Sequence, residues 1–84
     1  VEPIPKAIES IAKVRRYGLT EYPEKESWKR VTIEQYSDAL MRHFLAVMEN
    51  PLAKDVETGL YHVEHLLCNA AFLNQLIVTQ GEKK

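Results

Sequence analysis

The sequence predicts an all-α domain of three helices, at about residues 5–17, 32–49 and 59–79. Apolar residues recur three and four positions apart in these segments, as they do along the buried face of a helix. The first two segments also carry start signals, at Pro5 and at Thr32. With 84 residues, 45% hydrophobic and 27% charged, residues 1–84 have the composition of a single small globular domain.

The first helix is expected at about residues 5–17. Pro5 suits the first helical position, where its missing N–H costs nothing. Gly18 is expected to end the helix in a left-handed conformation. Arg15 and Arg16 fall near this end, where cations suit the negative end of the helix dipole.

Residues 19–31 show no helical period and carry Tyr22 and Trp28, so we expect an ordered loop. Loops of this length in small domains are usually functional or disordered. Two interpretations are open: Trp28 pins the loop to the core, or the loop closes over a ligand.

The second helix, at about residues 32–49, begins with a capping box. In Thr32-Ile-Glu-Gln35 the hydroxyl of Thr32 and the side chain of Gln35 each satisfy a backbone donor of the other residue. The spacing then predicts a buried face made of Ile33, Tyr36, Leu40, His43, Phe44 and Val47. His43 stands where an apolar residue is expected, so it is either a hydrogen-bonded core residue or a ligand.

The third helix is expected to begin at Thr58 or Gly59 and to end near Thr79. Its apolar residues lie on nearly all sides, which is typical of a central helix. An 84-residue chain has too little protein to cover such a helix. We therefore predict a two-fold homodimer in which the second and third helices of both copies form a four-helix core.

All three histidines lie on the predicted inner faces. His62, His65 and Asn69, at spacings i, i+3 and i+7, share one stripe of the third helix, and His43 faces inward from the second. With a carboxylate they would bind a divalent metal, and the acidic candidates are Asp55, Glu57, Asp38 and Glu49. Imidazole suits zinc, manganese, iron or nickel, whereas magnesium prefers oxygen ligands.

The remaining polar residues suggest a phosphate-bearing substrate. Arg42 and Lys29 would offset triphosphate charge, and Asn69 would orient a histidine or contact the substrate. Trp28 or Tyr22 would stack on a base. The sequence contains no phosphate-binding glycine loop and no serine or cysteine nucleophile beside a base. Metal-assisted attack of water on a phosphoryl group, with Asp55 or Glu57 assisting, is the chemistry these side chains support best.

Composition excludes several classes. The formal charge of -1 gives no overall basic signature for nucleic acid. A local basic set remains a weaker alternative; it consists of Arg15, Arg16, Lys25, Lys29 and Arg30. The single cysteine, Cys68, excludes an intrachain disulfide. No apolar run approaches 18 residues, so we expect no membrane span and a cytoplasmic protein.

The order of these features resembles a known family. Tyr17-Gly18, Trp28, Arg42-His43 and Gly59-Leu-Tyr-His62-Val-Glu-His65-Leu-Leu-Cys-Asn69 are similar to the phage-associated domain called dATP/dGTP diphosphohydrolase, N-terminal. That family is similar to the all-α MazG-type nucleotide pyrophosphohydrolases, whose Glu-x-x-Glu and Glu-x-x-Asp motifs hold magnesium. The corresponding helices here carry His43 with Glu49, and His62 with His65.

The resemblance implies an enzyme of a bacterial or phage-infected cell that hydrolyses deoxynucleoside triphosphates to monophosphate and pyrophosphate. It implies magnesium or manganese as the metal, whereas the histidines also admit zinc or nickel. The alternative is a non-catalytic helical homodimer, a phage accessory protein in which the histidines and Asn69 form a buried polar network that fixes helix register. Solvent access to the histidines distinguishes the two.

Overall fold

The computed structural model describes residues 4–21 and 27–83, and the side chains of these residues except 20, 21, 27 and 28. Its elements are α1 (Pro5–Glu21), the short 3-10 helix η1 (Ser27–Arg30), α2 (Ile33–Glu49) and α3 (His62–Glu82). The described residues form no β-strand, only an isolated antiparallel bridge between Lys54 and Tyr61. The predicted all-α class is confirmed.

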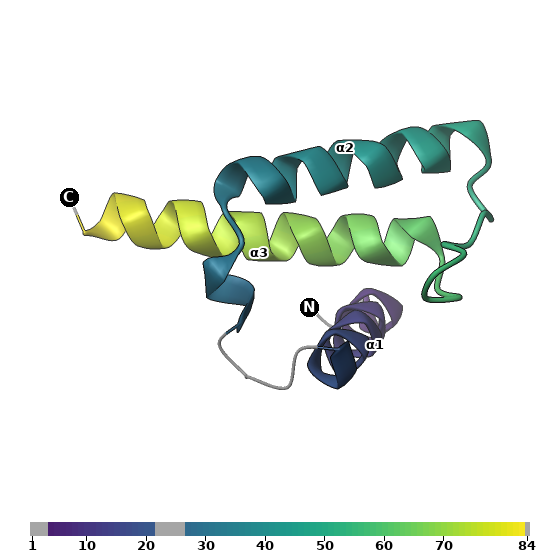
Figure 1. The fold of residues 1–84 in the computed structure, drawn as a ribbon, viewed down its shortest axis with the longest axis horizontal. Coiled ribbons are helices and arrows are strands. Elements are labelled where there is room, and N and C mark those ends of the chain that lie inside the picture. The colour runs from purple at the N-terminus through teal and green to yellow at the C-terminus, as the bar shows by residue number, and fades with distance from the viewer. Residues whose placement is uncertain (1–3, 22–26, 84) are drawn as a thin grey trace.

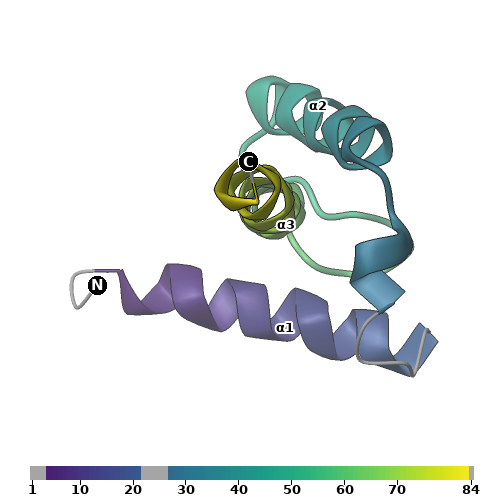
Figure 2. The ribbon, with the colours of Figure 1, turned by 90° about the vertical axis from the view of Figure 1, so that its left-hand side faces the viewer.

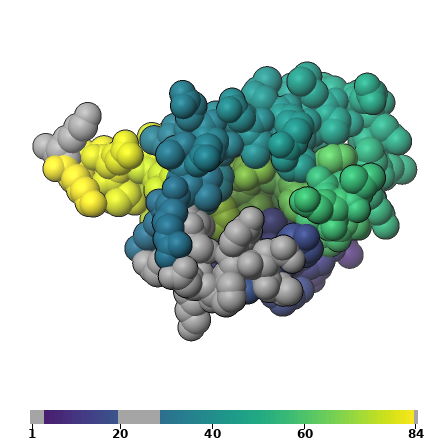
Figure 3. All heavy atoms as spheres, in the orientation of Figure 1, coloured from purple at the N-terminus to yellow at the C-terminus, as the bar shows by residue number. Residues whose placement is uncertain are grey.

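Helix α3 is the central element. Helix α2 runs antiparallel to it along one side, and Figure 1 shows the two axes nearly parallel. Helix α1 crosses α3 on the other side, as the view along α3 in Figure 2 shows. The last turns of α3 project beyond the other helices (Figure 3), and the molecule measures 40 × 29 × 26 Å. None of the described helices has the length and apolar content to cross a membrane.

Three predicted helix boundaries were wrong, one of them the end of α3, which lies at Glu82 and not near Thr79. Helix α1 passes through Gly18 and ends at Glu21, since glycine inside a helix costs only about 1 kcal/mol and the extra turn half-buries Leu19. Helix α3 begins at His62, three residues after Gly59. Gly59 has a φ of 74°, the one positive value among the described residues, and an α-helix cannot contain it.

The capping box of α2 is confirmed. The N–H of Gln35 donates to Oγ1 of Thr32 over 3.0 Å, and the N–H of Thr32 donates to Oε1 of Gln35 over 3.0 Å. Tyr36 and His43 are buried as predicted, but Phe44 is 40% exposed. Phe44 follows His43 directly and is therefore rotated by about 100° from the face that contacts α3.

The interior is unusually polar. The buried residues are the apolar Tyr36 and Cys68 together with the polar His43, Glu64 and His65, so polar side chains outnumber apolar ones among those described. The ring of Tyr36 packs on Phe72 with centroids 5.6 Å apart. Burial raises the pKa of Tyr36 to about 12 and that of Cys68 to about 11, so both groups are neutral in the folded chain.

Glu64 joins three parts of the chain. Its Oε2 accepts a hydrogen bond from Oγ of Ser10 and lies against Nζ of Lys13, each over 2.8 Å, and both partners belong to α1. Its Oε1 accepts the N–H of Tyr61 over 3.1 Å, just before α3 begins. Burial alone would raise the pKa of Glu64, but these bonds lower it below its ordinary value of 4.5. The carboxylate thus ties α1 to the first turn of α3.

We expect Glu64→Gln to lower the free energy of unfolding by about 1–3 kcal/mol, because it weakens hydrogen bonds to a buried carboxylate. Since the pKa of Glu64 is lower in the folded state, the contribution is present above about pH 4.5 and is lost as the pH falls through the folded-state pKa. Urea unfolding at several pH values measures it. Glu9→Gln, at an exposed position of α1, is the matched control. Equal stability of both variants at pH 7 would contradict the assignment.

Candidate metal centre

Three side chains from three parts of the fold converge where α2 and α3 pair. His43 comes from α2, His62 is the first residue of α3, and Asp55 lies in the connection between the two helices. One ligand atom from each of them lies within 4.8 Å of the other two. Two imidazole nitrogens and a carboxylate oxygen are ligands that transition metals accept.

The two histidines meet through the same ring atom. Nδ1 of His43 and Nδ1 of His62 are 2.8 Å apart, and the ring centroids are 5.0 Å apart with the planes inclined by 42°. In a hydrogen bond one of these nitrogens carries the proton and the other accepts it. Both Nδ1 atoms thus point into one small space.

Asp55 is held by a tight turn. Its Oδ1 accepts the N–H of Glu57 over 2.8 Å and that of Thr58 over 3.1 Å, and its carbonyl accepts the N–H of Gly59 over 2.8 Å. The positive φ of Gly59 lets the chain turn back, so that the N–H of His62 donates to Ala53 over 3.1 Å. The turn therefore sets Asp55 and His62 side by side.

His65 lies beside the three converging residues. Its ring stacks on that of His43, with centroids 4.8 Å apart and planes inclined by 15°. Its Nε2 forms a 2.7 Å hydrogen bond with Oγ1 of Thr58, which also accepts the N–H of Leu60 over 3.2 Å. His65 thus fixes the orientation of His43 from one side and contacts the loop from the other.

Burial and neighbouring charge determine the protonation of the cluster. Burial, with His65 and Arg42 nearby, lowers the pKa of His43 from 6.5 to about 4. Burial also lowers the pKa of His65, although the carboxylate of Asp55 opposes this. For Asp55, burial would raise the pKa, but the N–H groups of Thr58 and Glu57 lower it below its ordinary value of 3.8. At neutral pH His43 is a neutral imidazole and Asp55 a carboxylate, the forms that bind metals.

The other residues predicted for the site do not belong to the three converging groups. The carboxylate of Glu57 is exposed and is not among the three converging groups, and Asn69 is half-buried two turns further along α3. Arg42 is exposed on α2 beside His43, and Lys29 is exposed at the end of η1. Tyr22 and the side chain of Trp28 lie outside the described residues.

The roles of two residues near the cluster, Thr58 and Glu64, were not predicted from the sequence. Thr58 was expected to start a helix, but its hydroxyl bonds to His65. Glu64 stands between His62 and His65, and its N3 position in α3 would have indicated a capping role once the helix start was known.

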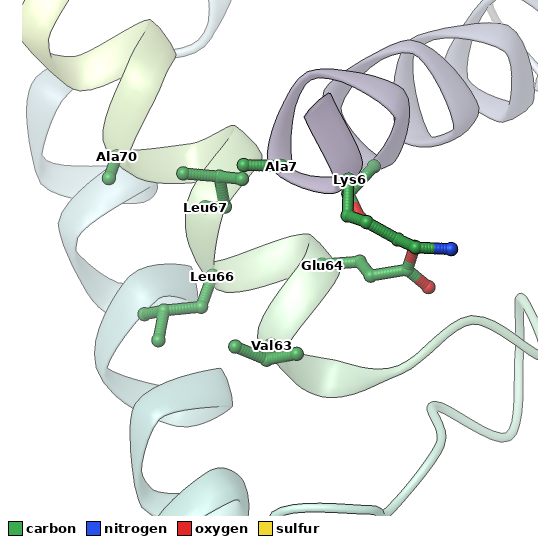
Figure 4. A pocket seen from close by; sticks show the side chains of 8 residues that line it. Lys6, Ala7, Val63, Glu64, Leu66, Leu67 and Ala70 are labelled. Atoms are coloured by element: carbon green, nitrogen blue, oxygen red, sulfur yellow. The ribbon is translucent and has the colours of Figure 1, made fainter. Parts of the chain in front are cut away.

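A separate groove of about 430 Å³ lies between α1 and α3. Figure 4 shows Ala7 from α1 and Leu66, Leu67 and Ala70 from α3 around it, with Lys6 and Glu64 at its edge. Its mainly apolar walls suit a charged triphosphate less well than the surroundings of the histidine cluster.

Comparison with known proteins identifies one family. A family model described as dATP/dGTP diphosphohydrolase, N-terminal, matches residues 3–84. Among curated proteins and solved structures, none matches the chain.

We expect the metal-free protein to lose stability as the pH falls from 6.5 towards 4. In this range the unfolded chain binds a proton at position 43 that the folded chain excludes, so the free energy of unfolding should fall by roughly 1–3 kcal/mol. Urea unfolding across this range measures the slope, which should be smaller in His43→Asn. An NMR titration in which His43 protonates at pH 6 or above would contradict the expectation.

Proposed function

Because the chain belongs to the dATP/dGTP diphosphohydrolase, N-terminal, family, we propose that it hydrolyses purine deoxynucleoside triphosphates to the monophosphate and pyrophosphate, using a divalent metal. The observation that carries the proposal is the convergence of His43, Asp55 and His62 within 4.8 Å. In this hydrolysis a water attacks a phosphorus atom of the substrate and pyrophosphate leaves. The reaction therefore needs an activated water and an environment that tolerates phosphate charge.

The donor set fits a transition metal. Two imidazoles and one carboxylate suit manganese, iron, nickel or zinc, whereas magnesium prefers sites made of oxygen. His43 and Asp55 already have the protonation states that metal binding requires at neutral pH. His65 stacks on the ring of His43, and Thr58 holds His65 through a hydrogen bond. Metal-binding histidines usually have neighbouring residues that fix their orientation in this way.

Bound at these residues, the metal would polarise a phosphoryl oxygen and lower the pKa of the attacking water. Glu57, in the same turn as Asp55, carries an exposed carboxylate and is our candidate general base. The guanidinium of Arg42, exposed beside His43, is our candidate contact for the triphosphate, with Lys29 as a second cation. Asn69, Tyr22 and Trp28 remain proposed substrate contacts.

A second candidate function is structural, and it has its own supporting observation. The 2.8 Å contact of His43 with His62 satisfies both Nδ1 atoms without a metal, and His43 is only 4% exposed. Such a network can specify helix pairing in a non-catalytic protein. Against this second candidate, Asp55 and His62 are only half-buried, so a ligand from solvent can reach them.

Metal binding separates the two candidates. At a concentration one hundred times the Kd, a site-bound metal stabilises the native chain by about 2.7 kcal/mol and raises Tm by roughly 10–20 °C. We expect this shift with manganese, nickel or zinc, measured by thermal unfolding. We expect it to disappear in Asp55→Asn and in His62→Gln.

The matched control is Asp38→Asn, which removes an exposed carboxylate of α2 outside the converging group. It should keep the full shift. If no metal changes Tm in the native chain and His62→Gln is simply less stable, the structural network is the correct function of the cluster.

We expect pyrophosphate release from dATP and dGTP in the presence of the stabilising metal. Asp55→Asn should lower kcat at least about 100-fold, since the loss of a residue that merely supports a metal ligand already costs about 10–100-fold. Arg42→Gln should raise KM about 10-fold, a loss of about 1.4 kcal/mol in binding the triphosphate, and Arg42→Lys should restore part of it.

Lys6→Gln, which removes an exposed cation from α1, should leave KM unchanged. Absence of turnover with every deoxynucleoside triphosphate and every stabilising metal would contradict the enzymatic proposal while leaving the metal site intact.

A further inference from the structure

A row of exposed apolar side chains runs along the side of α2 that faces away from α3. It consists of Met41, Phe44, Leu45 and Met48, which are 50%, 40%, 61% and 63% exposed, and we call it the α2 stripe. These positions share one face of a helix because they are three, four and seven residues apart. Leu52, 74% exposed, extends the stripe just beyond the end of α2. In Figure 1, α2 itself forms the upper edge of the molecule.

The chain exposes more surface than a stable monomer of its size. Its accessible surface is 6344 Å², whereas a compact protein of 9.7 kDa exposes about 5,100 Å². The difference of roughly 1,200 Å² is larger than the about 800 Å² that each partner buries in a standard interface. The radius of gyration of 13.2 Å likewise exceeds the about 12 Å of a compact 84-residue domain.

The charges around the stripe argue against an anionic surface as its occupant. Glu34 and Asp38 continue the same face of α2 towards its N-terminus and Glu49 follows Met48, so these three carboxylates outnumber Arg42, the one lysine or arginine of α2. Peripheral membrane helices carry lysine and arginine beside their apolar face. An acidic border would repel anionic lipid and nucleic acid.

The stripe is instead complementary to itself. Read in either direction it has a methionine, a pair of large apolar residues and a methionine, centred between Phe44 and Leu45. A two-fold axis through this centre brings Met41 of each copy against Met48 of the other, with the Phe44–Leu45 pairs in the middle. Isologous interfaces require this kind of self-complementary surface.

We propose that two copies of the chain form a homodimer in which the α2 stripes pack antiparallel about a two-fold axis. The two α2 helices lie at the centre and each is backed by its own α3, so the four helices form one layer in the order α3, α2, α2, α3. This differs from the four-helix core predicted from the sequence. His43 faces α3, on the side of α2 opposite to the stripe, so the dimer is independent of the proposed metal site.

Sedimentation equilibrium from low micromolar to a few hundred micromolar tests the proposal. The native chain should have twice the mass of 9.7 kDa. Leu45→Glu should raise the dimer dissociation constant at least about 30-fold, as expected at the centre of an interface. Because Leu45 is 61% exposed in the single chain, circular dichroism should show unchanged helix content.

Ile77→Glu is the matched control, since Ile77 is an exposed apolar residue of α3, 49% accessible and outside the stripe. It should leave the dimer intact. A native chain that stays monomeric throughout, or a Leu45→Glu chain that dimerises as well as the native one, would overturn the proposal. So would a dimer that Ile77→Glu dissociates to the same extent.

Disulfide trapping gives a second measurement that does not depend on a destabilised variant. Leu45→Cys should form a covalent dimer under mild oxidation, since a two-fold axis beside this position brings the two copies of it together. Cys68 is buried and should not react. Ile77→Cys should remain uncrosslinked, and equal crosslinking of both variants would overturn the proposal.

Discussion

The contact between the Nδ1 atoms of His43 and His62 determines how α2 and α3 meet. A buried ring nitrogen without a partner costs about 1–3 kcal/mol, so the 2.8 Å contact favours one register of the two helices. At the other end of the pair, the rings of Tyr36 and Phe72 pack on each other. One polar and one apolar contact therefore fix the antiparallel arrangement, and α1 is joined to it through the carboxylate of Glu64.

The connection between α2 and α3 also positions side chains of the histidine cluster. Oδ1 of Asp55 accepts two backbone N–H groups and shapes the turn, while a carboxylate has a second oxygen for other partners. Thr58 belongs to the same turn and contacts His65. The local bonds that end one helix and begin the next thus also orient the cluster. A change in this loop should disturb helix pairing and the proposed site together.

The sequence predicted the three α-helices, the start of α2 and the inward position of His43, because apolar period and capping pattern are local signals. It could not place His43 beside His62, because that contact depends on how α2 and α3 pair. It misplaced the C-terminal end of α1 and both ends of α3. Gly18 and Gly59 have the same local freedom, and only tertiary packing decides which of them turns the chain. The roles of Thr58 and Glu64 were missed because their partners, His65 and Lys13, depend on the positions of the loop and of α1. The candidate ligand Asp55 was identified only as one of several carboxylates.

The composition of the cluster bears on the substrate that it would bind. A metal site built from several carboxylates largely neutralises the charge of its cation. Imidazoles bind a metal in their neutral form and Asp55 contributes one negative charge, so a divalent cation held by His43, Asp55 and His62 would leave this group with a net positive charge. Arg42 adds a second positive group beside them. A partly buried positive centre attracts a triphosphate more strongly than a neutralised one. A site made of two histidines and one carboxylate is therefore compatible with phosphoryl chemistry, provided that the metal is one that imidazole binds.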